Sequence, residues 1–403
     1  MKILMLSVTF PYPPTQGGTQ VRTFNLLNYL RHDHDVTLVT LRSPDASEAE
    51  ITALRDSVSE LVLFDRPPAP AAGLWHKAAR LGQFVITGRP SGVWASYSPE
   101  MQVWVDTAVA RGHYDVLTCE HSVNEVYVRP EYAQHLRTIV NIHSSVYGTC
   151  VQQLQTGTAE KPGRDRFNLP LLKRYEQGFC RKFQDIVVTT EDDRQQFQAF
   201  APDRTLTVIP NGVDFSTFPA RSQDPGGQNL VFIGAMDNLA NIDAATFLVQ
   251  EILPAVRQEY PQTKLAIVGA RPVPAVQALA AIPGVTVTGA VPAMVDYLHR
   301  ATVCVIPMRT GLGIKNKTLE AMAAAVPVVA SDRGLEGLAV DEPLRALRAN
   351  NVAEYKVAIA RLFASLSLRV EISHSARRYI EGEFTWEQAG HRYTEVICGR
   401  NAS

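Results

Sequence analysis

The chain has 403 residues, a length typical of about two or three domains. Hydrophobic residues make up 46% and charged residues 20%, a composition that excludes a mostly disordered chain. With 39 basic and 40 acidic residues the net charge is −1, so we expect no nucleic-acid partner. The five cysteines are widely spaced without a C-x-x-C pair. We therefore expect neither a zinc ribbon nor a disulfide framework, and a reducing cytoplasm fits best.

The first half of the chain alternates apolar runs of strand length with segments of helical periodicity. Apolar residues at 21, 24, 27 and 30 predict a helix after the first run. Because such runs are typical of strands buried on both faces, we predict a parallel sheet covered by helices. The Pro-rich stretch from 66 and the region to 98 is predicted to be a surface excursion. The predicted strands are Ile3–Phe10, Val36–Leu41, Leu61–Phe64, Val116–Cys119, Ile139–Ile142 and Ile186–Thr190.

The same alternation restarts after residue 228. Helices are predicted at Asp243–Tyr260 and Thr318–Ala325, and the stretch 210–228 has the Pro and Gly content of a linker. We therefore predict a first domain at 1–209, a linker at 210–228 and a second α/β domain at 229–384. The predicted strands are Leu230–Ile233, Leu265–Val268, Val285–Val287, Val303–Ile306 and Val326–Ala330.

Two such doubly wound sheets bind ligands at the carboxyl ends of their strands. We therefore expect two Rossmann-like parallel-sheet domains that face each other across a cleft, with the active site in the cleft.

The segment after the strand at 303–306 carries the most specific chemistry. Gly311 and Gly313 let the backbone pass close to a ligand, and Lys315 and Lys317 lie where a helix begins. Cations add to the positive field of a helix N-terminus, so their presence there indicates a phosphate or pyrophosphate site. One turn later, Glu320 is placed to accept hydrogen bonds from ribose hydroxyls.

The segment has a simpler interpretation, which is a solvated basic turn in which Glu320 pairs with a lysine. Asn316 occupies the third glycine position of a dinucleotide fingerprint, which disfavours an NAD-dependent oxidoreductase. No glycine precedes Lys317, so the phosphate cradle of a P-loop is missing.

The run 311–330 resembles the donor-site signature of the GT4 group of retaining glycosyltransferases, which have the two-domain GT-B fold. Four further motifs stand in the expected order: the loop 10–18 with its Gly17-Gly18 pair, the entry to the second domain at 209–214, the turn at 232–237, and the loop 287–292. The sequence departs from the family pattern at Leu312, which replaces the first glutamate of the paired-glutamate motif, and at Ala235, which replaces an arginine.

The resemblance implies which residues contact the donor. Lys315 and Lys317, with Arg309 and the backbone N–H groups near the glycine pair, would stabilise the charge that grows on the departing diphosphate. It also implies that His143, which follows a strand, lies near the reacting sugar. The donor-binding residues implied are Gly17, Gly18, Gly234, Gly289, Ala290, Val291, Arg309, Gly311, Gly313, Ile314, Asn316, Thr318 and Glu320.

The implied reaction is transfer of a sugar from a nucleotide-diphosphate donor, UDP-sugar first and GDP-sugar next, with retention of anomeric configuration. The acceptor would be a glycan or a lipid-linked molecule in polysaccharide or glycolipid synthesis. No metal and no cofactor are expected, because the nucleotide sugar is a substrate. The family's proposal is a front-face reaction, in which the departing phosphate helps to deprotonate the acceptor. The last helix, at about 385–403, would complete the first domain.

The sequence is also compatible with two further functions: a nucleotide-sugar 2-epimerase of similar fold, and a non-catalytic nucleotide-sugar-binding scaffold. The segment 161–182 has seven basic and two acidic residues interleaved with apolar ones. It is either a surface helix packed on the first domain or a peripheral contact with an anionic membrane. We therefore expect a cytoplasmic protein that acts at the inner face of the membrane in the second case.

Overall fold

The structure is a computed structural model that describes residues 1–14, 17–68, 82, 84 and 88–400. Most of the predicted surface excursion, at 69–81, 83 and 85–87, lies outside the described residues, as do residues 15–16 of the first loop. The chain forms two compact units: one comprises Met1–Pro210 with the residues from Ala389 onward, and the other Asn211–Gln388.

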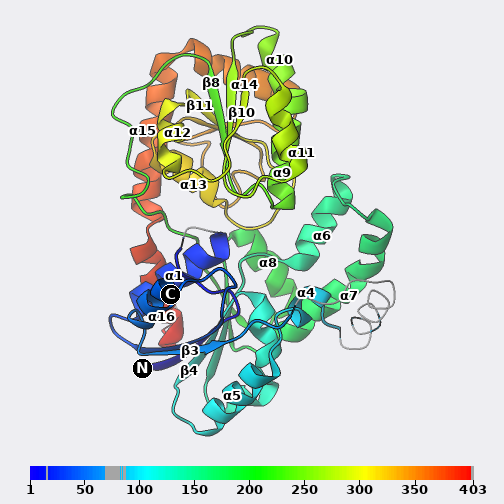
Figure 1. Cartoon of the computed structure of the whole chain (residues 1–403), viewed down its shortest axis with the longest axis vertical. Coiled ribbons are helices and arrows are strands. Elements are labelled where there is room, and N and C mark those ends of the chain that lie inside the picture. The colour runs from blue at the N-terminus through cyan, green and yellow to red at the C-terminus, as the bar shows by residue number, and fades with distance from the viewer. Residues whose placement is uncertain (15–16, 69–81, 83, 85–87, 401–403) are drawn as a thin grey trace. The chain divides into compact units, whose positions relative to one another are not determined.

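The first unit, in which Figure 1 labels the strands β3 and β4, is built on a seven-stranded parallel sheet in the order β3-β2-β1-β4-β5-β6-β7. β1 ends at Ser7, three residues earlier than predicted, because the N–H of Val8 donates to Asn124 Oδ1 (2.8 Å) rather than to a neighbouring strand. The edge strand β7 was not predicted. The strands are β1 (Lys2–Ser7), β2 (Asp35–Leu41), β3 (Glu60–Phe64), β4 (Val116–Glu120), β5 (Arg137–Asn141), β6 (Asp185–Val188) and β7 (Thr205–Val208).

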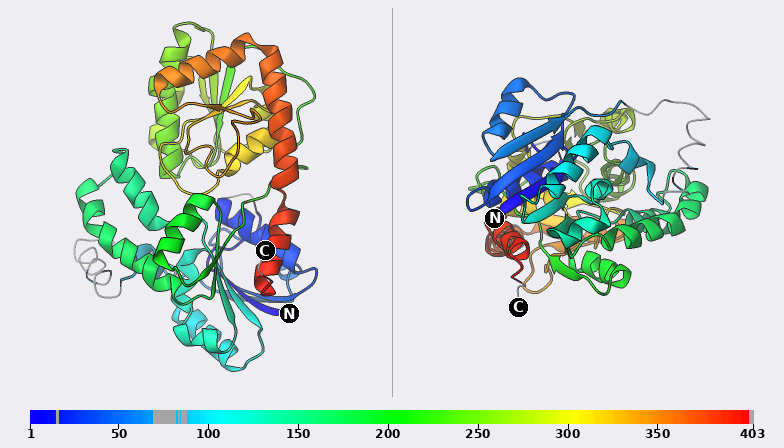
Figure 2. Two further views of the ribbon diagram at one scale, coloured as in Figure 1. Left: turned by 180° about the vertical axis from the view of Figure 1, so that it is seen from behind. Right: turned by 90° about the horizontal axis from the view of Figure 1, so that it is seen from below.

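Helices cover this sheet, and several begin with a side-chain cap. Ser145 caps α6 and Thr190 caps α8, as expected of hydroxyl side chains at N-termini. Figure 2 shows α16 in red beside the blue elements of the first unit, and a Cβ added to its Gly390 would lie 2.2 Å from the Tyr29 ring of α1. The helices are α1 (Gly18–Leu30), α2 (Glu48–Arg55), α4 (Ser91–Trp94), α5 (Pro99–Ala110), η1 (Ser122–Tyr127), η2 (Pro130–Gln134), α6 (Val146–Gln155), α7 (Pro162–Cys180), α8 (Glu191–Phe200) and α16 (Trp386–Ile397).

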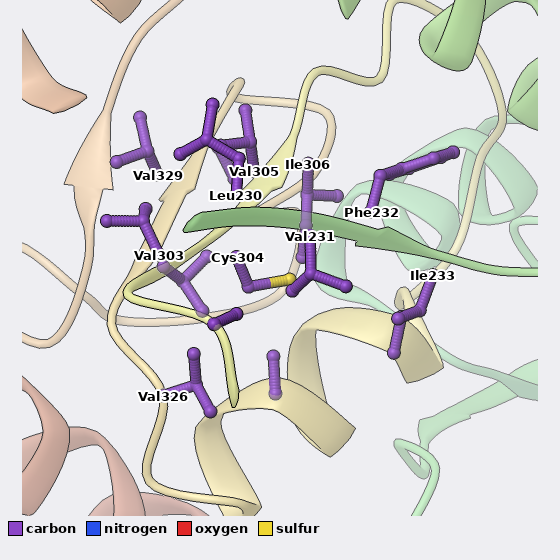
Figure 3. Packing of buried hydrophobic residues seen from close by; sticks show 14 of the residues in the cluster. Leu230, Val231, Phe232, Ile233, Val303, Cys304, Val305, Ile306, Val326 and Val329 are labelled. Carbon is purple, nitrogen blue, oxygen red and sulfur yellow. The ribbon is translucent and has the colours of Figure 1, made fainter. Parts of the chain in front are cut away.

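The second unit is built on a six-stranded parallel sheet in the order β10-β9-β8-β11-β12-β13. In Figure 3, Leu230 and Phe232 lie on one side of β8, and Val231 and Ile233 lie on the other. All four are buried, which explains why this strand is a continuous apolar run. The strands are β8 (Asn229–Ile233), β9 (Lys264–Val268), β10 (Val285–Val287), β11 (Val303–Ile306), β12 (Val328–Ala330) and β13 (Leu347–Arg348).

The predicted helix at 243–260 is a longer helical run, Leu239–Arg257, with a π-helical turn inside it. By length and composition alone this run could cross a membrane, but half of it is buried, and Ala244, Leu248 and Ile252 belong to the core of the unit. The helices of the unit are α9 (Leu239–Phe247), η3 (Leu248–Ile252), α10 (Leu253–Arg257), α11 (Pro274–Gln277), η4 (Ala278–Ala281), α12 (Met294–Arg300), α13 (Asn316–Ala323), α14 (Val352–Ala364) and α15 (Leu366–Glu383).

The stretch predicted as a linker is packed within the second unit from Asn211 onward. The buried Asp224 accepts two hydrogen bonds of 2.9 Å from Arg369 and pairs with Arg221 at 2.8 Å. A bridge joins Val213 to Thr385. The Pro and Gly content therefore indicated irregular backbone correctly, but it could not reveal these ion pairs with distant residues.

Candidate active site

Each sheet has a topological switch point, where the connections that follow two adjacent central strands lead toward opposite edges of the sheet. In the first unit it lies between β1 and β4, and in the second between β8 and β11. Loops diverge at the carboxyl ends of such strands and leave a crevice for ligands. The predicted site residues lie in the loops that follow β1, β5, β8, β10 and β11 or in the first turns of the helices α1 and α13, so each set is at the expected end of its own sheet.

The glycine pair follows β1 and opens α1. Gly17 has an extended backbone (φ 176°), and Gly18 begins the helix without a positive φ. A Cβ added to Gly17 would meet no atom within 4 Å. Neither backbone strain nor packing therefore requires Gly17, which favours the interpretation that it leaves room for a ligand at the N-terminus of α1.

The predicted His143 stands beside a second histidine. His121 directly follows β4, and the two rings meet edge to face with centroids 5.0 Å apart. Burial lowers the pKa of His121 to about 4. It also lowers the pKa of His143 well below its usual range, with further contributions from His121 and Arg22. Both imidazoles are therefore neutral at pH 7 and can each donate one hydrogen bond and accept another.

The backbone at His121 is strained, with a φ of 91°. Such a conformation persists only where the surroundings hold it in place, and it is enriched at active sites. Here the His121 N–H donates to the carbonyl of Asn141 (2.9 Å), and its own carbonyl accepts from the side chain of Asn124 (3.1 Å). The ends of β4 and β5 are thereby joined, which brings the two histidines together.

A buried polar network lies beneath the two histidines. Asn141 donates to Glu120 (2.8 Å) and accepts from the guanidinium of Arg22 (3.0 Å), and Tyr393 of α16 donates to Glu120 (2.5 Å). Burial raises the pKa of Glu120, although Tyr393, Asn141 and Arg22 oppose this shift. Burial also lowers the pKa of Arg22 to about 10, so its charge persists at neutral pH near His143.

In the second unit, Lys317 extends from the first turn of α13 toward the end of β8. Its ammonium donates to Asn241 Oδ1 (2.9 Å) and lies 5.8 Å from the centre of the Phe232 ring. Burial lowers its pKa from 10.5 to about 8, and the charge of Lys315 adds to this shift. Within the described residues no carboxylate lies within ion-pair distance of Lys317, so its charge has only a neutral amide as hydrogen-bond partner.

Gly234 makes room for this lysine. Its φ of 150° suits glycine, and an added Cβ would lie 2.9 Å from the amide of Asn241 and 3.2 Å from Lys317 Cε. A larger residue would therefore displace both side chains. Glycine at this position thus allows the lysine to reach the switch point.

Glu320 lies one turn after Lys317 and is half-buried. Burial raises its pKa to about 7, and the charge of Lys317 limits the increase. Among the described side chains it has no hydrogen-bond partner. Its predicted contact with ribose hydroxyls stays a prediction.

Two predicted cations are engaged elsewhere. Lys315 is buried and pairs with Glu336 (3.2 Å) and with the carbonyl of Gly313. Arg309 forms a two-point ion pair with Asp243 of α9 and lies 4.9 Å above the Phe247 ring. The structure therefore brings Lys317 to the switch point, with Glu320 one turn later on α13, but it does not leave the charges of Lys315 and Arg309 uncompensated.

The remaining predicted residues shape the loops. Gly311 and Gly313 have φ values of 96° and 81°, which favour glycine, and Ile314 between the glycines and the helix is buried. Asn316 accepts from Asn211 (2.6 Å), and the hydroxyl of Thr318 donates to the carbonyl of Gly334 (2.7 Å), so both side chains have partners within the unit.

The loop after β10 holds the last predicted set, Gly289, Ala290 and Val291. Gly289 has a φ of 72° and open space around it, and the hydroxyl of Thr288 donates to its carbonyl (2.8 Å). In the described part of the chain, no three His, Cys, Asp or Glu side chains form a group that could hold a metal ion.

Comparison with family models decides the assignment. A model described as Glycosyltransferase Family 4 matches residues 16–217, half of the chain, and one described as Glycosyl transferases group 1 matches residues 227–365. The chain belongs to these glycosyltransferases. A search of curated protein sequences finds no match.

Solved structures show that this glycosyltransferase has the GT-B fold. It resembles sucrose-phosphate synthase from Thermosynechococcus elongatus with a TM-score of 0.72 and 18% identity, over 99% of this chain and 98% of that one. It also resembles Anabaena HepE in complex with UDP, with a TM-score of 0.66 and 14% identity, over 99% and 100% of the two chains. For TarM the TM-score is 0.67 and the identity 13%, over 98% of both chains.

In this glycosyltransferase, several residues of the site were not predicted from the sequence: His121, Asn241 and the network of Arg22, Glu120 and Tyr393. A signal for His121 was present, because it closely follows the predicted strand Val116–Cys119, just as His143 directly follows the predicted strand Ile139–Ile142. The partners of the network were not predictable, since Tyr393 lies 273 residues from Glu120. Asn241 likewise lies 76 residues from Lys317, the lysine that it binds.

Proposed function

We propose that this glycosyltransferase is a retaining enzyme that transfers a sugar from a nucleotide-diphosphate donor to a glycan or lipid-linked acceptor in polysaccharide or glycolipid synthesis. UDP-sugar is the proposed donor, with GDP-sugar next. The structural neighbour HepE was solved with UDP and with UDP-glucose, and TarM with UDP, which supports a UDP donor.

The observation that carries the proposal is the charge of Lys317. This ammonium is destabilised by burial, stays protonated at pH 7, and has no carboxylate partner among the described residues. It also stands in the first turn of α13, whose N-terminus has no side-chain cap among the described residues and is the kind of helix end that binds anions. A diphosphate at this position would receive the lysine and these N–H groups together.

The residues then divide the chemistry between them. Lys317 and the N-terminus of α13 stabilise the charge that grows on the β-phosphate as the glycosidic bond breaks. Glu320 accepts hydrogen bonds from the ribose, and the loop 289–291 lies against the base. Neutral His143 binds hydroxyls of the transferred sugar. The departing phosphate takes the proton of the acceptor on the same face as the departing bond, which gives retention.

We propose that catalysis requires no bound metal and no cofactor, because the Lys317 ammonium and the N-terminus of α13 take the place of a metal at the diphosphate. Sugar transfer should therefore be unchanged by EDTA, and its loss would contradict this view. We also propose that the enzyme is cytoplasmic and contacts the inner face of the membrane through 161–182. The exposed face of α7 carries Arg164, Arg166, Lys173 and Arg174, and Phe167 is 57% exposed beside them.

Thermal unfolding with UDP, GDP, ADP and dTDP tests the proposal directly. A diphosphate at about 100 times its Kd adds about 2.7 kcal/mol to stability, which gives a visible shift of the melting temperature. We expect UDP to give this shift in the wild type and in Lys264→Ala, an exposed lysine of the same unit, but not in Lys317→Ala. If UDP still raised the melting temperature of Lys317→Ala, the proposed diphosphate site at α13 would be wrong.

The products separate the remaining functions. A retaining transferase forms a product whose anomeric configuration, read by NMR, matches that of the donor. Change of the sugar without any acceptor would instead indicate an epimerase. Nucleotide binding without turnover on any acceptor would indicate a scaffold.

A further inference from the structure

Glu176 of α7 is a buried carboxylate that contacts the beginning of another helix. Its side chain is 1% exposed. It accepts hydrogen bonds from the hydroxyl of Ser145 (2.6 Å) and from the backbone N–H groups of Val146 (2.7 Å) and Tyr147 (3.4 Å). Glu176 therefore binds the N-terminus of α6 from outside that helix.

The first turn of α6 depends on these contacts. The first four N–H groups of a helix lack partners within the helix, and its N-terminus attracts negative charge. Glu176 takes two of these donors, and Ser145, the capping residue, takes a third by accepting from Gly148 (2.8 Å). The hydroxyl of Ser145 also accepts from Gln196 of α8. Helices α7 and α8 thus both hold the residue at which α6 begins.

His143 lies in the short segment between two fixed points. On one side the N–H of Ile142 donates to the carbonyl of Val187 in β6 (2.7 Å), which anchors the segment to the sheet. On the other side Ser145 is held by Glu176. Only Ser144 separates His143 from this second anchor. A shift of the α6 N-terminus would therefore move the imidazole.

We propose that Glu176 is a positioning residue, which fixes the N-terminus of α6 and thereby holds His143 in place for sugar transfer. The inference rests on the proposed function for the role of His143, but the contact itself does not. Glu176 touches no substrate and acts through the α6 cap. Its function is to keep the imidazole where the hydroxyls of the sugar can meet it.

The test is a double-mutant cycle of Glu176→Gln with His143→Ala, with sugar transfer measured in the full-length enzyme. Gln has nearly the same shape but brings no charge and only one acceptor. We expect Glu176→Gln to lower kcat about 10- to 100-fold, because small misplacements of a catalytic group have effects of this size. KM for the donor should stay within about two-fold. In the His143→Ala background the same change should have almost no further effect.

Equal losses of kcat in both backgrounds would overturn the proposal, because Glu176 would then act through stability alone. The matched control is Glu191→Gln, which changes an exposed acidic residue in the first turn of α8 and should leave kcat unchanged. Ser145→Ala removes the hydrogen bond to Glu176 together with those from Gly148 and Gln196, and it keeps the contacts of Glu176 with Val146 and Tyr147, so kcat should fall in the same direction. This second variant, which leaves Glu176 in place, keeps the test open if Glu176→Gln folds poorly.

Two measurements do not depend on turnover. Hydrogen exchange at the amides of Val146 and Tyr147 should accelerate in Glu176→Gln, and the NMR signals of the His143 ring should shift. Unchanged exchange or unchanged ring signals would overturn the proposal even if no acceptor is found. If Glu176→Gln lost its exchange protection while His143→Ala kept full activity, the contact of Glu176 with α6 would be confirmed. The proposed role of His143 would then be refuted.

Discussion

The switch points of the two units share a topology but differ in charge. Beside the first switch point, at the ends of β4 and β5, stand two imidazoles that burial keeps neutral. Between β8 and β11 stand an ammonium and a carboxylate with pKa values of about 8 and about 7. The same cause, burial without an ion-pair partner, acts on all four groups.

The charge at neutral pH differs between the two units because the ordinary pKa values of histidine and lysine differ. A histidine begins at 6.5, so a downward shift removes its charge throughout the neutral range. The pKa of a lysine begins at 10.5, so a comparable downward shift leaves the lysine charged at pH 7, although burial makes this charge unfavourable. The sheet end with the two neutral imidazoles suits the binding of neutral hydroxyl groups. The sheet end with the buried ammonium suits the binding of a diphosphate, because the diphosphate compensates the unfavourable charge of the lysine.

The largest expected effect is that of His143→Ala. If the first unit contributes a neutral hydrogen-bonding imidazole at the reacting sugar, kcat should fall about 100-fold, with KM for the donor little changed. His121→Ala should have a smaller effect, because this ring supports His143 from the side. Steady-state kinetics with saturating acceptor measures both.

The control for this prediction is His135→Ala, which removes an exposed histidine of the same unit. It should retain full activity. If His143→Ala instead raised KM for the nucleotide and spared kcat, the division of roles between the two units would be wrong. The imidazole would then belong to donor binding.

The sequence predicted the sheets well for a physical reason. Strands such as β8 and β11 are buried on both faces and therefore read as continuous apolar runs. The missed strands lack this signal: β7, with the sequence TLTV, is an edge strand without a fully buried residue, and β13 has two residues. The glycines at 311 and 313 were also predictable, because loops that leave a sheet toward a ligand favour positive φ.

Charge pairing was the part that the sequence could not supply. Lys315 and Arg309 were grouped with Lys317 because they are close in the chain. Their partners, Glu336 and Asp243, lie 21 and 66 residues away. Only the folded chain shows which cation is paired, and that distinction decides which one is available to an anion.

The pH dependence sharpens the contrast between the two units. Glu320 must be ionised to accept ribose hydroxyls, so kcat/KM for the donor should rise as the pH increases through about 7. Lys317 must be protonated, so kcat/KM should fall as the pH increases through about 8, by up to ten-fold per pH unit. The two values belong to an interacting pair, and the maximum should lie between them.

Variants assign each limb of this profile. Glu320→Gln should remove the acid limb, Lys317→Ala the alkaline limb, and His143→Ala neither, because its imidazole does not titrate in this range. A profile that is flat from pH 6 to pH 9 would contradict the pKa values on which the comparison rests.

The smallest expected effect is that of Arg309→Ala. This variant tests whether an arginine that is close to Lys317 in the sequence contacts the donor or stays paired with Asp243. Since the guanidinium is bound to Asp243 and lies over Phe247, its loss should reduce stability by about 1 kcal/mol and change KM for the donor by no more than about two-fold. Asp243→Asn provides the matched test, because it weakens the ion pair and leaves the arginine in place. If Arg309→Ala raised KM ten-fold, the arginine would have to leave Asp243 when the donor binds. The charge of the second switch point would then be shared by two cations and not carried by Lys317 alone.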